Sequence, residues 1–386
     1  MKVKVGIIGI GNIGTAHASA IYQGEIDGME LCALCDISPQ RLAQLKEEFP
    51  GVPTFASSDE LIKSNLVDAI IIATPHYFHP VIALEALKAG IHVLSEKPIG
   101  AYTYGMDELM EAHKQSGKVF SVMLNQRANK LFKEAKRIID SGEIGEIKRS
   151  VWIITNWYRT QAYYNSSDWR ATWSDEGGGV LMNQAPHNLD LWQWLCGMPE
   201  RVYATCAFGK HHNIEVEDEA TIIAEYANGA SGVFIASTGD YPGTNRLEIT
   251  GTKGRIVLEK GTLTLQRFSC DERLFCYGEC EKIEIDEQVI LDEEYNGHEI
   301  ILQNFTNAIL YGEPLIAPAG EAINSLMICN SAYLSAWKGE MVSLPVNEEE
   351  YLELLKQRAH DSHQKSKKAT KSTFEGTYKN RWNTNW

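Results

Sequence analysis

Short apolar runs alternate with amphipathic stretches along the first third of the chain. The runs lie at residues 3–8, 31–35, 68–73, 91–94 and 119–124, and each is followed by a turn or a helical pattern. Strands that alternate with helices are typical of βαβ units, which place parallel strands in one sheet with helices on its faces. The N-terminal region is therefore predicted to be an α/β domain with a parallel sheet.

The pattern changes in the second half of the chain. Further strands are predicted at 147–155, 202–208, 220–226, 232–238, 246–250 and 255–259, and most are joined by short turns. Such spacing predicts an α+β domain with a large open, mainly antiparallel sheet. At 386 residues the chain also exceeds the roughly 250–300 residues that one core supports. We expect domains at 1–124 and 125–346, followed by a C-terminal helix and a basic, aromatic tail at 347–386.

A glycine-rich turn follows the first strand. Gly9, Gly11 and Gly14 have the spacing G-x-G-x-x-G before a helix, and the second strand ends in Asp36. In this context the motif predicts a Rossmann dinucleotide site: glycines allow the turn and the close approach of pyrophosphate to the helix N-terminus. The carboxylate of Asp36 should accept bonds from ribose hydroxyls, which favours NAD over NADP.

Three further loops should reach the same sheet edge, because ligands bind at the carboxyl ends of parallel strands. They are 74–80, the tripeptide Glu96-Lys97-Pro98, and 125–127. Lys97 precedes a proline, so its backbone is held extended or in a turn, and we expect it near the nicotinamide. His76 and His79 are interpreted as cofactor-lining and helix-start residues, and no metal site is predicted. The predicted cofactor-binding residues are Gly9, Gly11, Asn12, Ile13, Gly14, Asp36, Ile37, Arg41, Thr74, His76, His79, Glu96, Lys97, Asn125 and Arg170.

The segment from Glu176 to Asp190 carries the second dense signal. Three glycines, at 177–179, precede a stretch predicted to be helical, in which Asn183 and His187 lie four residues apart and therefore on one face. Seven aromatic residues precede the triplet, between Trp152 and Trp173, and could either fill a core or stack on a sugar ring. The predicted catalytic residues are Lys97, His187 and Asn183. The predicted substrate-binding residues are Lys97, Arg127, Tyr158, Trp169, Asn183 and His187.

Composition narrows the class of protein. The net charge of −15 argues against nucleic-acid and anionic-membrane partners. The eight cysteines show no disulfide-like framework, so we interpret them as small buried residues in a reducing cytoplasm. The tail from Lys365 combines basic residues with four aromatic ones; either it is disordered or it docks on a neighbouring subunit or over the substrate cleft.

Taken together, these motifs resemble the Gfo/Idh/MocA oxidoreductases, the family of glucose–fructose oxidoreductase and inositol dehydrogenase. The resemblance rests on the glycine motif, Glu96-Lys97-Pro98, the segment from Gly177 to His187, and residues 249–254, and it extends to about Val346. It implies hydride transfer between NAD(P) and a hydroxyl of a sugar, inositol or glycoside, with Lys97 and His187 in the catalytic pocket. It also implies a homo-oligomer formed through the C-terminal sheet.

One position departs from the family pattern. Many sugar and inositol dehydrogenases of the family carry aspartate four residues before the histidine, where this chain has Asn183. An amide cannot transfer a proton at neutral pH, so acid–base chemistry should fall on Lys97 and His187. Two alternative functions remain open: a redox-neutral glycosidase that uses NAD, and a non-catalytic NAD-sensing regulatory protein.

Overall fold

The computed structural model describes residues 2–362, which form two compact units. The first unit contains Met1–Ala128 together with Asn296–Leu326. The second contains Asn129–Tyr295 and the segment that begins at Met327. The sequence suggested a continuous second domain over 125–346, whereas residues 296–326 pack within the first unit. Residues 365–386, for which either disorder or docking is predicted, lie outside the described residues.

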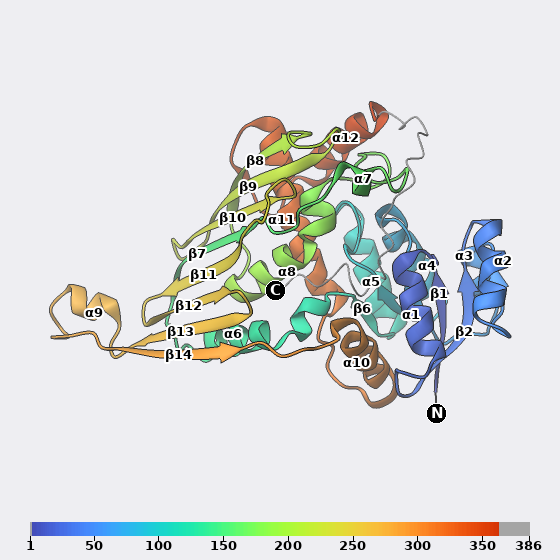
Figure 1. The fold of residues 1–386 in the computed structure, drawn as a ribbon, viewed down its shortest axis with the longest axis horizontal. Coiled ribbons are helices and arrows are strands. Elements are labelled where there is room, and N and C mark those ends of the chain that lie inside the picture. The colour runs from blue at the N-terminus through green and yellow to red at the C-terminus, as the bar shows by residue number, and fades with distance from the viewer. Residues whose placement is uncertain (1, 363–386) are drawn as a thin grey trace. The chain divides into compact units, whose positions relative to one another are not determined.

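A six-stranded parallel sheet forms the centre of the first unit (Figure 1). Its strands follow the order β3-β2-β1-β4-β5-β6, and their bounds are β1 Val3–Ile8, β2 Met29–Cys35, β3 Thr54–Phe55, β4 Ala69–Ile72, β5 His92–Ser95 and β6 Phe120–Val122. All four residues of β4 are buried, as expected for a strand with both faces covered.

Helices of the first unit follow the strands in βαβ order. They are α1 Asn12–Tyr22, α2 Pro39–Glu48, α3 Ser58–Lys63, α4 His79–Lys88, α5 Met106–Ser116 and α10 Gly297–Tyr311, with 3₁₀ turns η1 His76–Phe78 and η2 Asn125–Ala128. Ser38 caps α2 by accepting the N–H of Arg41, and Pro39 occupies the first helical position.

A nine-stranded sheet forms the centre of the second unit (Figure 1). Its order is β14-β13-β12-β11-β7-β10-β9-β8-β15, with bounds β7 Ile147–Ile154, β8 Arg201–Phe208, β9 Glu217–Glu225, β10 Ser231–Ser237, β11 Asn245–Gly251, β12 Gly254–Glu259, β13 Thr262–Phe268, β14 Ile285–Leu291 and β15 Val342–Ser343. Only the β7–β10 pair is parallel. The predicted fold class, a Rossmann-type domain plus a mainly antiparallel sheet domain, is confirmed.

The remaining helices belong wholly or partly to the second unit. They are α6 Lys130–Asp140, α7 Gln161–Tyr164, the π-helical turn η3 Val180–Gln184, α8 Pro186–Cys196, α9 Glu272–Cys276, α11 Ala319–Lys338 and α12 Glu348–His360. Helices α6 and α8 pack together and contact the sheet through β13 and β7 (Figure 1). No helix among residues 2–362 is long and apolar enough to cross a membrane.

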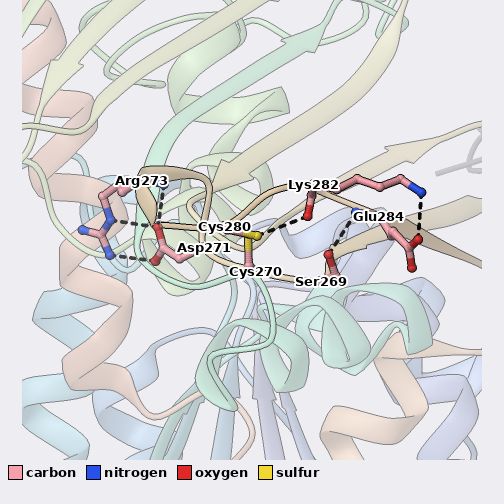
Figure 2. The surroundings of a disulfide bond; sticks show 7 residues. All are labelled: Ser269, Cys270, Asp271, Arg273, Cys280, Lys282 and Glu284. Atoms are coloured by element: carbon pink, nitrogen blue, oxygen red, sulfur yellow. Dashed lines mark hydrogen bonds and ion pairs between the residues drawn. A yellow bond between two sulfur atoms is a disulfide. The ribbon is translucent and has the colours of Figure 1, made fainter. Parts of the chain in front are cut away.

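Two cysteines of the β13–β14 connection form a disulfide bond, Cys270–Cys280 (Figure 2). The bond closes the loop that carries α9, which lies at the end of this connection and away from the other strands (Figure 1). The expectation of no disulfide and of buried cysteines is therefore wrong for this loop, where Cys276 is also exposed. The pairing arises because the chain between two neighbouring strands folds back on itself, a property that cysteine spacing alone does not reveal.

Candidate active site

The glycine turn of the first unit has the close contacts that a dinucleotide site requires. A Cβ atom at Gly14 would lie 2.0 Å from the carbonyl oxygen of Gly9, so α1 can approach β1 only because this residue is glycine. Gly9 has φ +91°, a conformation that L side chains rarely adopt. A Cβ at Gly11 would meet no atom within 4 Å, which leaves open space beside the first turn of α1. This open space at a helix N-terminus fits a pyrophosphate.

Asp36 lies at the end of β2 and is held against the glycine turn. Its carboxylate accepts the N–H of Ile10 and the N–H of Ser38, both at 2.9 Å. Arg41 binds the turn as well, through its Nε–H to the carbonyl of Ile10 at 2.9 Å, and it forms an ion pair with Glu48. Arg41 therefore supports the glycine turn. Ile37, which follows Asp36 in the sequence, is 88% exposed.

Two buried polar atoms mark the carboxyl edge of the first sheet. The hydroxyl of Thr74, after β4, and the amide oxygen of Asn125, after β6, have no hydrogen-bond partner among the described residues. Buried polar atoms are seldom left unsatisfied in folded proteins. These two atoms therefore fit a site in which NAD supplies the missing partners.

The two histidines of the β4 loop have different surroundings. His76 is buried in η1, whereas the ring nitrogens of His79 lie 2.7 Å from the carbonyl oxygens of Pro98 and Thr74. Burial lowers the pKa of His79, although both hydrogen bonds oppose this shift. His79 begins α4 and ties the β4 loop to the Glu96-Lys97-Pro98 loop.

Glu96 organises the loop after β5. Its carboxylate is buried and accepts the Nε2–H of His17 at 2.8 Å, and the backbone N–H of Lys97 at 3.3 Å. Burial favours the protonated acid, but the hydrogen bond and electrostatic interaction with His17, together with the electrostatic effects of His298 and Lys97, outweigh burial and lower the pKa of Glu96 to about 2. The carboxylate next to Lys97 is therefore ionised at neutral pH.

Sequence reasoning missed the two histidines around Glu96. The ring of His298, from α10, lies 5.8 Å from that of His17 and 3.2 Å from the amide nitrogen of Asn125. Burial lowers the pKa of His298 to about 4. His17 follows the glycine motif by one helical turn and could have been noticed, but nothing local connects His298 to a strand some 200 residues earlier.

Arg127 has a structural contact that the sequence did not suggest. Its guanidinium is almost fully buried and forms an ion pair with Glu321, within the first unit. This ion pair ties η2 to the start of α11. A role in substrate binding stays a prediction.

In the second unit, a buried glutamate holds the glycine triplet. Glu217, on β9, accepts the N–H groups of Gly179 and Leu181 at 2.9 and 2.8 Å, and the hydroxyl of Tyr333 at 2.7 Å. A Cβ at Gly179 would lie 1.9 Å from the carbonyl oxygen of Glu217, so glycine is required there. Burial raises the pKa of Glu217 to about 7, although these bonds oppose the shift.

The segment after the triplet differs from the continuous helix that we expected. Residues Val180–Gln184 form a π-helical turn, closed by the N–H of Ala185 on the carbonyl of Val180 at 2.8 Å, and α8 begins at Pro186. Proline has no N–H to continue a helix from the preceding turn, and it is favoured at a helix start. Asn183 therefore lies in the π-helical turn and the buried His187 in the first turn of α8, so the two residues do not belong to one continuous α-helix. A shared face for the two side chains stays a prediction.

Asn183 has a carboxylate partner. Its Nδ2–H donates to Oε1 of Glu176, a residue that is 1% exposed and directly precedes the glycine triplet. Gln184 next to it donates from Nε2 to the hydroxyl of Tyr163 at 3.1 Å. The π-helical turn thus connects the predicted Asn183 to Glu176 and to the aromatic segment.

The aromatic segment divides into core and surface residues. Trp152, Trp157, Tyr164 and Trp173 are buried, whereas Tyr158 is 43% exposed. Two guanidinium groups lie near the ring of Tyr163, with Arg159 at 4.9 Å and Arg170 at 4.7 Å from the ring centre. Arg170 also lies over the ring of Trp169 at 4.6 Å and donates to the Tyr163 hydroxyl at 2.8 Å.

One group of potential metal ligands lies elsewhere in the second unit. His211, Glu219 and Asp240 have ligand atoms within 4.8 Å of one another among the described residues. The ammonium group of Lys210 lies 2.6 Å from Glu219 and already balances its charge. No metal function is assigned to this exposed group.

Comparison with known proteins agrees with this geometry. Residues 3–124 match the model of the oxidoreductase family with an NAD-binding Rossmann fold, and residues 132–257 match the GFO/IDH/MocA C-terminal domain. Myo-inositol 2-dehydrogenase of Thermotoga maritima is 29% identical over 66% of this chain and 74% of its own length. Levoglucosan dehydrogenase of Pseudarthrobacter phenanthrenivorans is 27% identical over 66% of this chain and 73% of its own length.

Solved structures extend the similarity. The WlbA dehydrogenase of Bordetella pertussis, in complex with NADH and UDP-GlcNAcA, is 28% identical with a TM-score of 0.75, over 90% of this chain and all of the other. The expectation of NAD as cofactor is confirmed by the family match and by this NADH-bound neighbour. The protein therefore belongs to the Gfo/Idh/MocA family of NAD-binding oxidoreductases.

Proposed function

We propose that the protein oxidises a secondary hydroxyl of a sugar, inositol or glycoside in an NAD-dependent reaction. When bound at the first unit, NAD supplies the acceptor for the hydride, at C4 of the nicotinamide. The observation that carries the proposal is the loop after β5, in which the ionised Glu96 fixes the backbone of Lys97 at the carboxyl edge of the sheet. Relatives named as inositol and levoglucosan dehydrogenases support this substrate class.

We assign the proton transfer to Lys97 and His187. One of them accepts the proton of the substrate hydroxyl, and the other stabilises the negative charge that develops on the oxygen. Asn183 has no titratable proton, so it orients the hydroxyl through hydrogen bonds. The predicted substrate contacts of Arg127, Tyr158 and Trp169, and the cofactor contact of Arg170, remain part of this proposal.

The arginine pair on Tyr163 favours a narrower substrate class, a sugar that carries an anionic group. Arg159 and Arg170 bring two positive charges to one ring, next to the glycine triplet segment in sequence. Guanidinium groups bind carboxylates and phosphates through paired N–H donors. The WlbA dehydrogenase, crystallised with a nucleotide sugar acid, supports this class. A lower KM for uronates or nucleotide sugars than for neutral sugars, lost in Arg159→Gln, would support it.

The assignment of Lys97 is tested by Lys97→Ala. General acid–base groups contribute about 10²–10⁴-fold to rate, so turnover should fall by about that factor. The dissociation constant for NAD, measured by fluorescence titration, should change little. Lys114→Ala, which removes an exposed lysine of α5, serves as the control and should retain both properties. Wild-type turnover in Lys97→Ala would rule out the assignment.

Measuring NADH formation with a panel of inositols, hexoses and glycosides separates the two alternative functions. A redox-neutral glycosidase would cleave glycosides with NAD retained and no net NADH. An NAD-sensing regulator would bind NAD but oxidise no member of the panel.

We also propose that the protein forms a homo-oligomer through the nine-stranded sheet. Ile223 on β9 is 44% exposed, which is unusual for a large apolar side chain within a strand. Light scattering should give a mass of at least two chains. Ile223→Glu should lower that mass if this face of the sheet forms the contact.

A further inference from the structure

We propose that Glu176 is a positioning residue for Asn183. Its carboxylate fixes the side-chain amide of Asn183 so that the amide oxygen, Oδ1, is presented to accept the hydrogen bond of the substrate hydroxyl. The inference deepens the proposed function and rests on it for the identity of the hydroxyl. The contact between Glu176 and Asn183 lies entirely within the second unit.

The backbone places the Glu176 carboxylate before any substrate arrives. The N–H groups of Glu176 and Gly177 both donate to the carbonyl of Thr172 at 3.1 Å, which forms a tight turn. The side chain folds back into this turn, where Oε2 accepts the N–H of Ala171 at 2.5 Å. Ala171 itself has φ 57°, a left-handed conformation that costs energy for a residue with a side chain.

The chemistry of the pair determines the orientation of the amide. Both oxygens of the Glu176 carboxyl group act as acceptors, Oε2 from the N–H of Ala171 and Oε1 from Asn183, so Asn183 directs its NH₂ group, not its oxygen, towards Glu176. The amide plane then directs Oδ1 to the opposite side. Without the carboxylate, the two ends of the amide would be nearly equivalent in size and the orientation would no longer be fixed.

The segment places an acid and an amide side by side. Asn183 carries the amide, and the carboxyl group lies one hydrogen bond away on Glu176, a residue that is 1% exposed.

A polarity exchange tests the pair. In Glu176→Gln, the two donors from Ala171 and Asn183 face only one acceptor oxygen, so kcat should fall by about tenfold or more while the KM for NAD stays unchanged. In Asn183→Asp, two carboxylates meet in a buried place, and kcat at neutral pH should fall similarly. In the double variant, the amide introduced at position 176 offers its oxygen to Ala171 and its NH₂ to the carboxylate introduced at position 183. The value of kcat should then recover to within about threefold of wild type.

Asp175→Asn is the matched control, because it removes one negative charge from the exposed neighbour of Glu176 and should leave kcat unchanged. Melting temperatures of all variants separate misfolding from loss of positioning. Wild-type kcat in a folded Glu176→Gln, or a folded double variant no more active than the single variants, would overturn the inference.

A second readout does not depend on the proposed function. In protein labelled with ¹⁵N-asparagine, the side-chain amide signal of Asn183 is identified by its absence from Asn183→Asp. This signal should shift in Glu176→Gln and stay in place in Asp175→Asn. If the wild type oxidises no sugar but the signal shifts in Glu176→Gln, the proposed function is wrong and the contact between Glu176 and Asn183 is supported. If the signal does not shift in Glu176→Gln, the contact itself is wrong.

Discussion

At the scale of single residues, two buried carboxyl groups have pKa values shifted in opposite directions. Glu96 and Glu217 are both buried, yet the pKa of Glu96 is lowered to about 2 and that of Glu217 is raised to about 7. The difference arises because Glu96 gains a hydrogen bond from His17 and favourable electrostatic interactions with His17, His298 and Lys97, whereas the hydrogen bonds to Glu217 come from backbone N–H groups and the Tyr333 hydroxyl. Glu96 is therefore suited to hold a charge, and Glu217 to anchor the backbone of the glycine triplet.

Glu217 should make stability depend on pH near neutrality. Because its folded pKa lies above the usual value of 4.5, it stabilises the fold most below pH 4.5, and this contribution is lost as pH rises through about 7. The difference in unfolding free energy between wild type and Glu217→Gln should fall by about 1.4 kcal/mol per pH unit within this window. Urea denaturation at several pH values measures it, and a difference that is constant from pH 5 to 8 would contradict the prediction.

At the scale of elements, the sequence predicted the helices and strands that have a clear pattern of apolar residues. It missed the elements whose structure depends on contacts with distant parts of the chain. The strands of the first sheet and the glycine turn followed from apolar runs and from the motif before Asn12. The strands β13 and β14 were not predicted, although Thr262–Phe268 alternates in burial, because polar residues fill the exposed positions of this edge. The π-helical turn was missed because its signal, Pro186 after a glycine triplet, also suits an ordinary helix start.

The pairing of Glu176 with Asn183 could not be predicted either. The two residues are seven apart, and only the turn closed on Thr172 brings the carboxylate to the amide. The candidate residues were therefore predictable as types and positions, whereas their hydrogen-bond partners required the fold.

The loop that carries α9 offers a test of the cysteine chemistry. Iodoacetamide added to the native, unreduced protein should modify Cys276 first, because it is exposed and not part of the disulfide. Burial raises the pKa of Cys196 to about 12 and also raises the pKa of Cys329, so both should resist alkylation. Peptide mass spectrometry should find Cys270 linked to Cys280. Rapid alkylation of those two cysteines would instead support the reducing, cytoplasmic location expected from the sequence.

At the scale of the whole molecule, the first unit is not a continuous piece of chain. Gln303 exchanges hydrogen bonds with the backbone of Asp27 at 2.8 and 3.0 Å, and the carbonyl of Ala317 accepts from the hydroxyl of Ser121 at 2.8 Å. The segment 296–326 thus completes a unit that begins at the N-terminus. No pattern of apolar residues indicates that segment 296–326 packs with the N-terminal unit, which is why the sequence suggested a simple boundary at 124.

Residues 1–128 alone should therefore bind NAD weakly and unfold without a cooperative transition. Joining residues 296–326 through a flexible linker should restore both properties, because it restores the contacts to Asp27 and Ser121. Isothermal titration with NAD and thermal denaturation followed by circular dichroism measure the effect. NAD binding by residues 1–128 equal to that of the full chain would show that the added segment is dispensable.

The central claim is that the protein transfers hydride from a carbohydrate hydroxyl to NAD. The most direct measurement is NADH absorbance at about 340 nm with a panel of inositols, hexoses, uronates and glycosides, for the wild type and for Lys97→Ala and His187→Ala. We predict NADH formation with at least one member of the panel, equal in amount to the ketone or lactone produced, and its loss in both variants. NAD binding without NADH formation from any member of the panel would contradict the account.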